Sequence, residues 1–125
     1  IDFLGAVDHD DVPDIIRGFD IALAPYPDLP HDFYFSPLKL YEYLGCGVPV
    51  VASAVGQIDL VLTDGVDARL APPGDVHRLA TACVDLLDDA SAAARIGSAG
   101  AALVHSRFTW DRNVASVIDL TTPRP

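Results

Sequence analysis

The chain has 125 residues and a formal net charge of -10, from 18 acidic and 8 basic residues. With 50% hydrophobic and 21% charged residues, it has the composition of one compact globular domain rather than of a disordered segment. The negative charge argues against a protein that binds nucleic acid or an anionic membrane surface.

The apolar runs are short, and the longest, IALA and VPVVASAV, fall far below the ~20 residues of a membrane span. We therefore expect no membrane-spanning segment and a cytoplasmic protein. Cys46 and Cys83 belong to no Cys-x-x-Cys or Cys/His cluster, which favours a reducing compartment. The histidines show no spacing that would place two of them on one helical face, so we expect no metal site.

The first third of the chain alternates between strand and helix patterns. Residues 1–5 read as a short apolar strand, and residues 8–19 as a helix with Pro13 in its first turn. Residues 20–25 form a continuous apolar run, as expected for a strand of a sheet that is covered on both faces. Three prolines then predict a rigid, extended loop over residues 25–35.

The same alternation continues through the middle of the chain. Ser36 is the expected N-cap of a helix with Pro37 at its first position, which runs to about Leu44 and ends at two glycines. Residues 48–53 follow as a strand, and residues 58–65 as a short helix and turn.

The last part of the chain is mainly helical. Residues 68–75 read as a short strand and turn, and Asp75 is placed to cap the next helix. From Val76 onward the pattern is helical to the end, with a break at residues 106–110 and a frayed tail over residues 121–125.

About four strands separated by single helices predict an α/β fold: a Rossmann-like parallel sheet with helices on both faces. We expect one partial domain over residues 1–125, with a core over 1–105, a terminal helix over 109–120 and a tail over 121–125. The partial character is expected because complete sheets of this type have roughly five or six strands, so one edge should lack its neighbours. The absence of methionine likewise suggests a piece of a longer protein.

The candidate site lies where the loop over residues 25–36 leads into a helix. Ligands bind such sheets at the carboxyl ends of the strands, and the first turn of a helix offers N–H groups to an anion. Lys39 lies in that turn, where its charge has the wrong sign for the helix dipole unless an anion binds.

Glu42 has apolar and aromatic neighbours, so we expect it to be half buried. Two vicinal hydroxyls of a ribose could then satisfy its carboxylate. A surface ion pair between Lys39 and Glu42 is the alternative interpretation.

A family resemblance is carried by the ordered segments FLGAV, VPDIIRGFDIALAPY, SPLKLYEYLGCGVPVVAS, VGQI, TDGVDARLAPPGD and RFTWDRNVASVIDL. Together they closely resemble the C-terminal, nucleotide-sugar-binding domain of the family-4 retaining glycosyltransferases of GT-B architecture. The resemblance implies a parent enzyme of carbohydrate biosynthesis that transfers a sugar from a nucleoside-diphosphate sugar to an acceptor, with retention and without a metal or other cofactor. This segment would supply donor binding.

The resemblance also implies roles for single residues. The family has a Glu-x7-Glu pattern whose second glutamate holds the donor ribose hydroxyls, and Glu42 matches it. The first glutamate, which contacts the transferred sugar, falls on Tyr34, so this chain departs from the family there. Asp32, two residues earlier, could partly substitute as a sugar contact.

The remaining donor contacts of the family are mainly backbone groups. Its diphosphate contacts are N–H groups at the start of the helix, so Ser36, which precedes Pro37, is also expected to contact the donor. Because Pro37 has no N–H, Leu38 and Lys39 would carry that role. The base contacts fall just after the first predicted strand, on Gly5, Ala6 and Val7. The family's GG-x-x-E region corresponds to residues 55–59, with an apparent shortening by one residue.

The resemblance assigns no catalytic residue to this segment. The family's Arg and Lys pair, which neutralises the leaving diphosphate, lies before the part that corresponds to Ile1, and the acceptor-binding N-terminal domain lies earlier still. We therefore expect little or no transferase activity from residues 1–125 alone. The alternative is a non-catalytic module that binds a sugar nucleotide. If the gene also encodes the upstream part of the domain with its Arg and Lys pair, the enzyme interpretation is favoured over the binding module.

Overall fold

Three parallel strands form the sheet in a computed structural model that describes residues 1–31 and 36–121. They are β1 (Ala22–Ala24), β2 (Val50–Ser53) and β3 (Arg69–Ala71), in the order β1-β2-β3. In the register of the central strand, Val51 lies opposite Leu23 of β1 and Arg69 of β3. The predicted α/β class with a parallel sheet is therefore confirmed.

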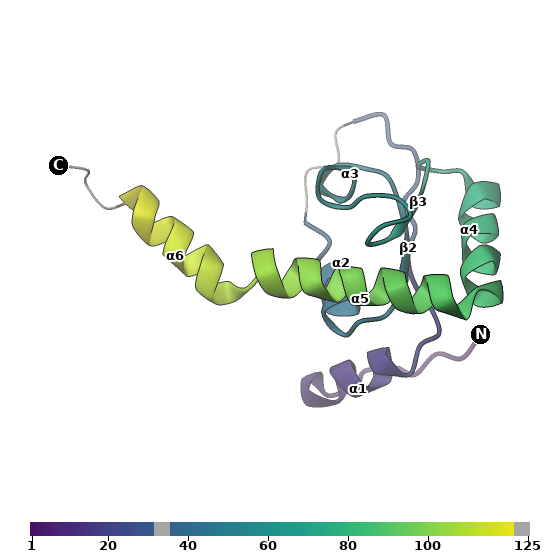
Figure 1. Cartoon of the computed structure of the whole chain (residues 1–125), viewed down its shortest axis with the longest axis horizontal. Coiled ribbons are helices and arrows are strands. Elements are labelled where there is room, and N and C mark those ends of the chain that lie inside the picture. The colour runs from purple at the N-terminus through teal and green to yellow at the C-terminus, as the bar shows by residue number, and fades with distance from the viewer. Residues whose placement is uncertain (32–35, 122–125) are drawn as a thin grey trace.

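Helices connect the strands, and further helices follow the last strand (Figure 1). A single 3-10 turn, η1 (His9–Asp11), leads into the first α-helix. The α-helices are α1 (Val12–Arg17), α2 (Leu38–Gly45), α3 (Gln57–Val61), α4 (Val76–Asp88), α5 (Ala90–Arg107) and α6 (Trp110–Thr121).

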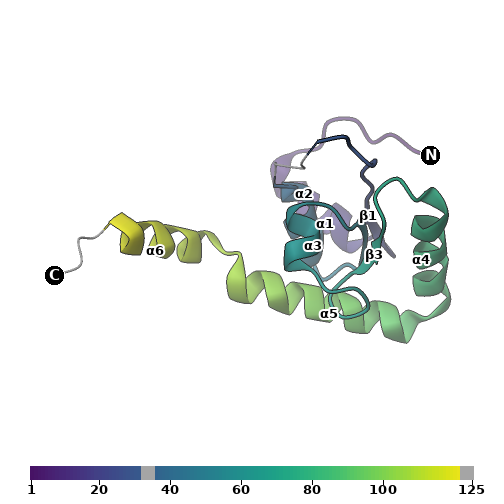
Figure 2. The same cartoon turned by 90° about the horizontal axis from the view of Figure 1, so that it is seen from above.

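Helices cover both faces of the sheet, as predicted. Along β2, successive side chains point to opposite faces. Val50 and Ala52 belong to the core with Leu40, Leu44 and Ile58 of α2 and α3, whereas Val51 packs with Ala82, Leu86 and Ile96 of α4 and α5. Figure 2 shows the same division, with α4 on one side of the sheet and α1, α2 and α3 on the other. Every β2 residue is buried, because a parallel strand inside such a fold has no solvent-facing side.

The predicted first strand is wrong, and the described residues contain three strands rather than four. Residues 1–5 form no strand, and Ile1 and Phe3 are almost fully exposed. A strand exists only where a neighbouring strand accepts its hydrogen bonds. No described strand pairs with residues 1–5, so their apolar pattern has nothing to pack against.

Two aspartates begin the long helices. Asp75 accepts a hydrogen bond from the Arg78 N–H at 2.9 Å, which confirms the predicted cap of α4. Asp89 accepts one from the Ala92 N–H at 2.9 Å and starts α5. The continuous helix predicted from Val76 is therefore interrupted, because the Asp89 side chain offers an N-cap that competes with helix continuation.

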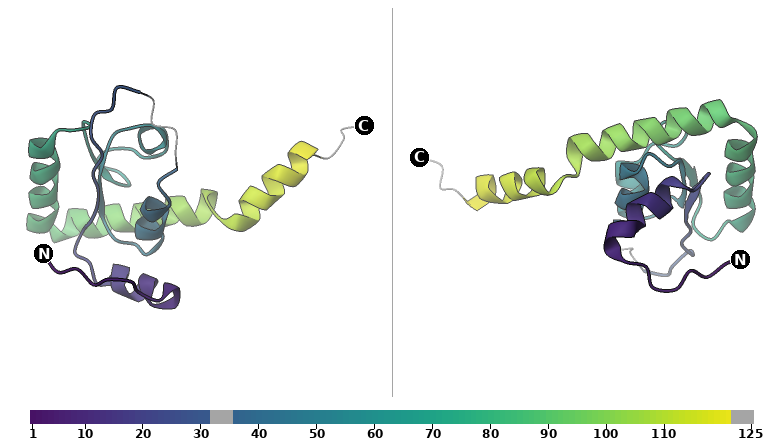
Figure 3. Two further views of the ribbon diagram at one scale, coloured as in Figure 1. Left: turned by 180° about the vertical axis from the view of Figure 1, so that it is seen from behind. Right: turned by 90° about the horizontal axis from the view of Figure 1, so that it is seen from below.

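Past this interruption, α5 runs along the sheet and α2, and α6 extends away from the rest of the molecule in every view (Figure 3). No residue of α6 is buried. None of the helices in residues 1–31 and 36–121 combines the length and the apolar composition needed to cross a bilayer.

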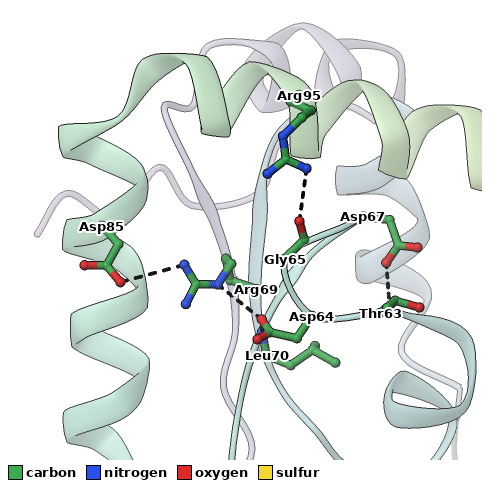
Figure 4. A network of polar contacts seen from close by, with 8 residues as sticks. All are labelled: Thr63, Asp64, Gly65, Asp67, Arg69, Leu70, Asp85 and Arg95. Carbon is green, nitrogen blue, oxygen red and sulfur yellow. Dashed lines mark hydrogen bonds and ion pairs between the residues drawn. The ribbon is translucent and has the colours of Figure 1, made fainter.

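A polar network ties the turn before β3 to the strand (Figure 4). The Asp64 carboxylate accepts hydrogen bonds from the Leu70 N–H at 2.8 Å and from Arg69 Nε at 3.1 Å. Arg69 also faces Asp85 of α4 at a longer distance of 3.7 Å. The contact with the Leu70 N–H is the one that fixes the backbone.

We expect Asp64→Ala to lower the free energy of unfolding by about 1 kcal/mol, the usual net value of such a hydrogen bond. Asp85→Ala is the matched control, since its side chain is 53% exposed and makes a single long ion pair. It should change stability by less than about 0.5 kcal/mol. Urea denaturation of both variants measures the difference, and equal losses would contradict this account of the network.

Candidate functional site

The loop that leaves β1 is anchored at the carboxyl edge of the sheet. The Tyr26 N–H donates to Ser53 Oγ at 2.9 Å, and the Ser53 hydroxyl donates to the Tyr26 carbonyl oxygen at 3.1 Å. The same carbonyl accepts from the Gly74 N–H at 3.0 Å. Ser53 is buried at the end of β2. Tyr26 is thus held against the ends of both following strands, at the edge where ligands of parallel sheets bind.

The start of α2 differs from the prediction by one residue. Pro37 has φ -79° and ψ 85°, and the Leu38 N–H donates to the Ser36 carbonyl oxygen at 3.0 Å. This is an inverse γ-turn, so the helix begins at Leu38, and the Ser36 side chain does not cap it. The Leu38 N–H, one of the two backbone groups expected to donate to the diphosphate, is therefore already hydrogen-bonded to the Ser36 carbonyl oxygen. Within the described ranges the Lys39 N–H has no acceptor.

The Lys39 side chain extends over an aromatic ring. Its Nζ lies 5.4 Å from the centroid of the Tyr26 ring, within the range of a cation–π interaction. Burial raises the pKa of Tyr26, and the neighbouring Tyr43 raises it further. The ring therefore remains an uncharged phenol at neutral pH. Across residues 1–31 and 36–121 Lys39 makes no ion pair, so the alternative pairing with Glu42 is not formed.

Glu42 is exposed, so the prediction that it is half buried was wrong. Leu40 and Leu44 are the buried residues of α2. They are four residues apart on one helical face, and Glu42, two residues from each, lies on the opposite face. Its side chain faces solvent and borders two clefts.

The first cleft, which we call the α2–α6 cleft, has a volume of about 510 Å³. It brings together Ser36, Leu38 and Glu42, three of the predicted donor-binding residues, with Gln57 at the start of α3. The remaining lining residues were not predicted as site residues and are mostly apolar or aromatic: Tyr41, Val104, Phe108, Trp110 and Asn113. Such a lining suits a ligand with a flat ring and a few polar groups.

The second cleft, the α1–α2 cleft, has a volume of about 290 Å³ and is also bordered by Glu42. His9, Arg17 and His105 line it together with Glu42 and Cys46. The sequence offered no signal for this group, because its members come from three helices and a turn that are far apart in the chain.

The other predicted site residues are not gathered at these clefts. Gly5, Ala6 and Val7 are exposed and line neither cleft, and Lys39 also lines neither of them. Tyr34 and Asp32 lie outside the described residues. In the part of the chain that the structure describes, no three His, Cys, Asp or Glu side chains form a group that could hold a metal ion.

Comparison with known proteins gives a family and relatives of known activity. A family model described as "Glycosyl transferases group 1" matches residues 1–89. The chain is 34% identical over 119 residues to a D-inositol 3-phosphate glycosyltransferase of Salinispora tropica, covering 94% of this chain and 23% of that protein. It is 36% identical over 110 residues to a phosphatidyl-myo-inositol mannosyltransferase of Mycobacterium leprae, covering 88% of this chain and 28% of that protein. The chain thus spans about a quarter of the length of these curated relatives.

Solved structures show the same relationship. Sucrose-phosphate synthase of Thermosynechococcus elongatus matches with a TM-score of 0.82 and 27% identity, over 95% of this chain and 29% of that one. The Anabaena protein HepE, solved in complex with UDP-glucose, matches with a TM-score of 0.73 and 25% identity, over 88% of this chain and 30% of that one. In each case the similarity is to a part of a longer chain.

Proposed function

This chain belongs to the group 1 glycosyl transferase family, and from that membership we propose that the carboxyl edge of its sheet binds the nucleotide part of a nucleoside-diphosphate sugar. The whole protein would transfer the sugar from this donor to an acceptor with retention of configuration. Another domain of the same protein would bind the acceptor.

The observation that carries the proposal is the α2–α6 cleft. Ser36, Leu38 and Glu42, chosen from the sequence as donor-binding residues, line it together with Gln57. The cleft includes Leu38, the first residue of α2, where the partial positive charge of the helix start favours a phosphate. The complex of HepE with UDP-glucose supports a sugar nucleotide as the ligand.

Glu42 would accept hydrogen bonds from the two ribose hydroxyls. Its exposed carboxylate is accessible to a ligand and would lose water when the ligand covers it. Hydrogen bonds to a charged group are roughly twice as strong as neutral ones, and each is worth about 1.5–3 kcal/mol. The Lys39 N–H would contact the diphosphate.

We also propose that this segment does not transfer sugar alone. Departure of a nucleoside diphosphate requires positive charge that stabilises the developing negative charge on its phosphates. Lys39 is the sole cation among the residues of the first turn of α2. Three arginines elsewhere are paired with aspartates: Arg17, Arg69 and Arg78.

We expect UDP or GDP to bind saturably to the chain and Glu42→Gln to weaken this binding by roughly 1–3 kcal/mol, because the amide is a weaker acceptor for the ribose hydroxyls. Isothermal titration calorimetry of both nucleotides measures the affinity and identifies the base. Asp85→Asn, on α4, is a control with the same change of net charge at a distance from the cleft. If Glu42→Gln leaves the affinity unchanged, Glu42 is a solvated surface residue. If neither nucleotide binds the parent chain, this segment does not form the donor site.

A further inference from the structure

Lys39 is the one lysine of the chain, and its surroundings differ from those of an ordinary surface cation. Its ammonium group lies over the Tyr26 ring, with Nζ 5.4 Å from the ring centroid. No carboxylate pairs with it across residues 1–31 and 36–121, although the chain carries 18 acidic residues. A carboxylate partner would hold the ammonium group but would also cancel its charge. An aromatic ring can hold it and leave the charge available.

The Tyr26 backbone is fixed more firmly than that of an ordinary loop residue. Ser53 contacts both its N–H and its carbonyl oxygen, at 2.9 and 3.1 Å, and the Gly74 N–H donates to the same carbonyl at 3.0 Å. Ser53 is 3% exposed. Tyr26 follows the carboxyl end of β1 by two residues, so these bonds hold it at the edge of the sheet. Lys39 lies in the first turn of α2, and its ammonium group is held at this same edge.

We propose that Tyr26 is a positioning residue that holds the Lys39 ammonium group, unneutralised, for the diphosphate of the donor. The proposal rests on the proposed function. It adds Tyr26 as a residue that acts on the donor through Lys39. The Pro37 turn uses the Leu38 N–H within the chain, so less of the diphosphate charge can be met by the backbone. The ammonium group beside the Lys39 N–H then provides most of the positive charge at the start of α2.

The alternative is that Lys39 only packs its stem on Tyr26. The two accounts differ for ligands with and without phosphates, because a packing role affects UDP and uridine equally. Lys39→Met should weaken UDP binding by about tenfold and leave uridine binding unchanged. Tyr26→Leu should weaken UDP binding by about two- to fivefold, as expected for an exposed cation–π contact, again without an effect on uridine. Tyr26→Phe keeps a ring and should bind UDP like the parent chain.

A double-mutant cycle tests whether Tyr26 acts through Lys39. In the Lys39→Met background, Tyr26→Leu should have no further effect on the affinity for UDP. If Tyr26→Leu weakens UDP binding equally with and without Lys39, or weakens uridine binding as much as UDP binding, the positioning role is wrong.

The inference and the proposed function can fail separately. The inference fails while the proposed function stands if UDP binds and Glu42→Gln weakens the binding, but neither Lys39→Met nor Tyr26→Leu weakens it. If neither UDP nor GDP binds the parent chain, both fail. GDP and guanosine replace UDP and uridine if GDP is the nucleotide that binds.

Because Tyr26 packs against the core, the Tyr26→Leu variant could fail to fold. A spectroscopic test on the parent chain does not depend on that variant. Because Lys39 is the only lysine, its ε-CH2 signal in a carbon–proton NMR spectrum is unambiguous. The ring current of Tyr26 should shift this signal upfield in the parent chain and in Tyr26→Phe, and titration with UDP should move it. An ε-CH2 signal at the position of a free lysine, or one that UDP leaves unmoved, would overturn the proposal.

Discussion

Gly97→Ala is expected to lower the free energy of unfolding by about 3 kcal/mol, at the upper end of the usual cost of overpacking. The Cβ of an alanine at this position of α5 would overlap the carbonyl oxygen of Gly47 and lie 3.2 Å from its carbonyl carbon and 3.3 Å from Pro49 N. These are backbone atoms, so no rotation of a side chain can relieve the overlap. The expected loss remains large although alanine is the better helix former by roughly 1 kcal/mol.

Gly45→Ala is the matched control for this substitution. Gly45 is the last residue of α2, and its added Cβ would meet only Val104 Cγ1, at an ordinary contact distance of 3.8 Å. We expect no loss of stability, or a gain of up to about 1 kcal/mol. Guanidinium denaturation followed by circular dichroism measures both variants. A loss at Gly97 no larger than that at Gly45 would show that α5 can move away from the turn before β2 at little cost.

Leu44→Ala is the second substitution with a large expected effect, a loss of about 2–5 kcal/mol, because Leu44 is fully buried where α2 meets α5. Its neighbour across the helix contact is Gly100. A Cβ at Gly100 would lie 2.6 Å from Leu44 Cδ2 and 2.9 Å from the Asp67 carbonyl oxygen. Gly100→Ala should therefore destabilise the chain too, through one side-chain and one backbone overlap.

The double variant gives the sharper test of this contact. Leu44→Ala removes the Cδ2 atom that Gly100→Ala would strike, so the two losses should sum to more than the loss of the double variant. We expect a coupling energy of at least about 0.5 kcal/mol. The overlap with the Asp67 carbonyl persists, so the cost of Gly100→Ala should not vanish. Additive losses would mean that the α2–α5 contact rearranges in one of the single variants.

The parts of the fold that were predicted correctly depend on local chemistry. The apolar runs around β1 and β2, and the Asp75 cap of α4, are encoded by neighbouring residues. The strand expected at residues 1–5 failed because pairing is not a local property. The end of α4 was missed although Asp89 provides the same cap chemistry as Asp75, since a run of good helix formers on both sides concealed it.

The candidate site was predictable to a similar degree. Ser36, Leu38 and Glu42 do line one cleft, because residues near the start of one helix are neighbours in any fold that forms that helix. The exposure of Glu42 could have been foreseen, since its position between Leu40 and Leu44 places it on the face opposite the buried one. The contact between Lys39 and Tyr26 and the lining by Phe108 and Trp110 could not. They depend on how distant segments pack, for which no spacing in the sequence gives a signal.

The turn at Pro37 changes what evolution can adjust in such a site. A backbone N–H is present whatever residue occupies its position, so a site built from backbone donors tolerates substitution and is hard to tune. Because the Leu38 N–H is bonded to Ser36, recognition of the donor phosphates under the proposed function passes in part to a side chain. Substitutions at positions 39 and 26 could then raise or lower donor affinity in small steps while the fold of the sheet edge is preserved.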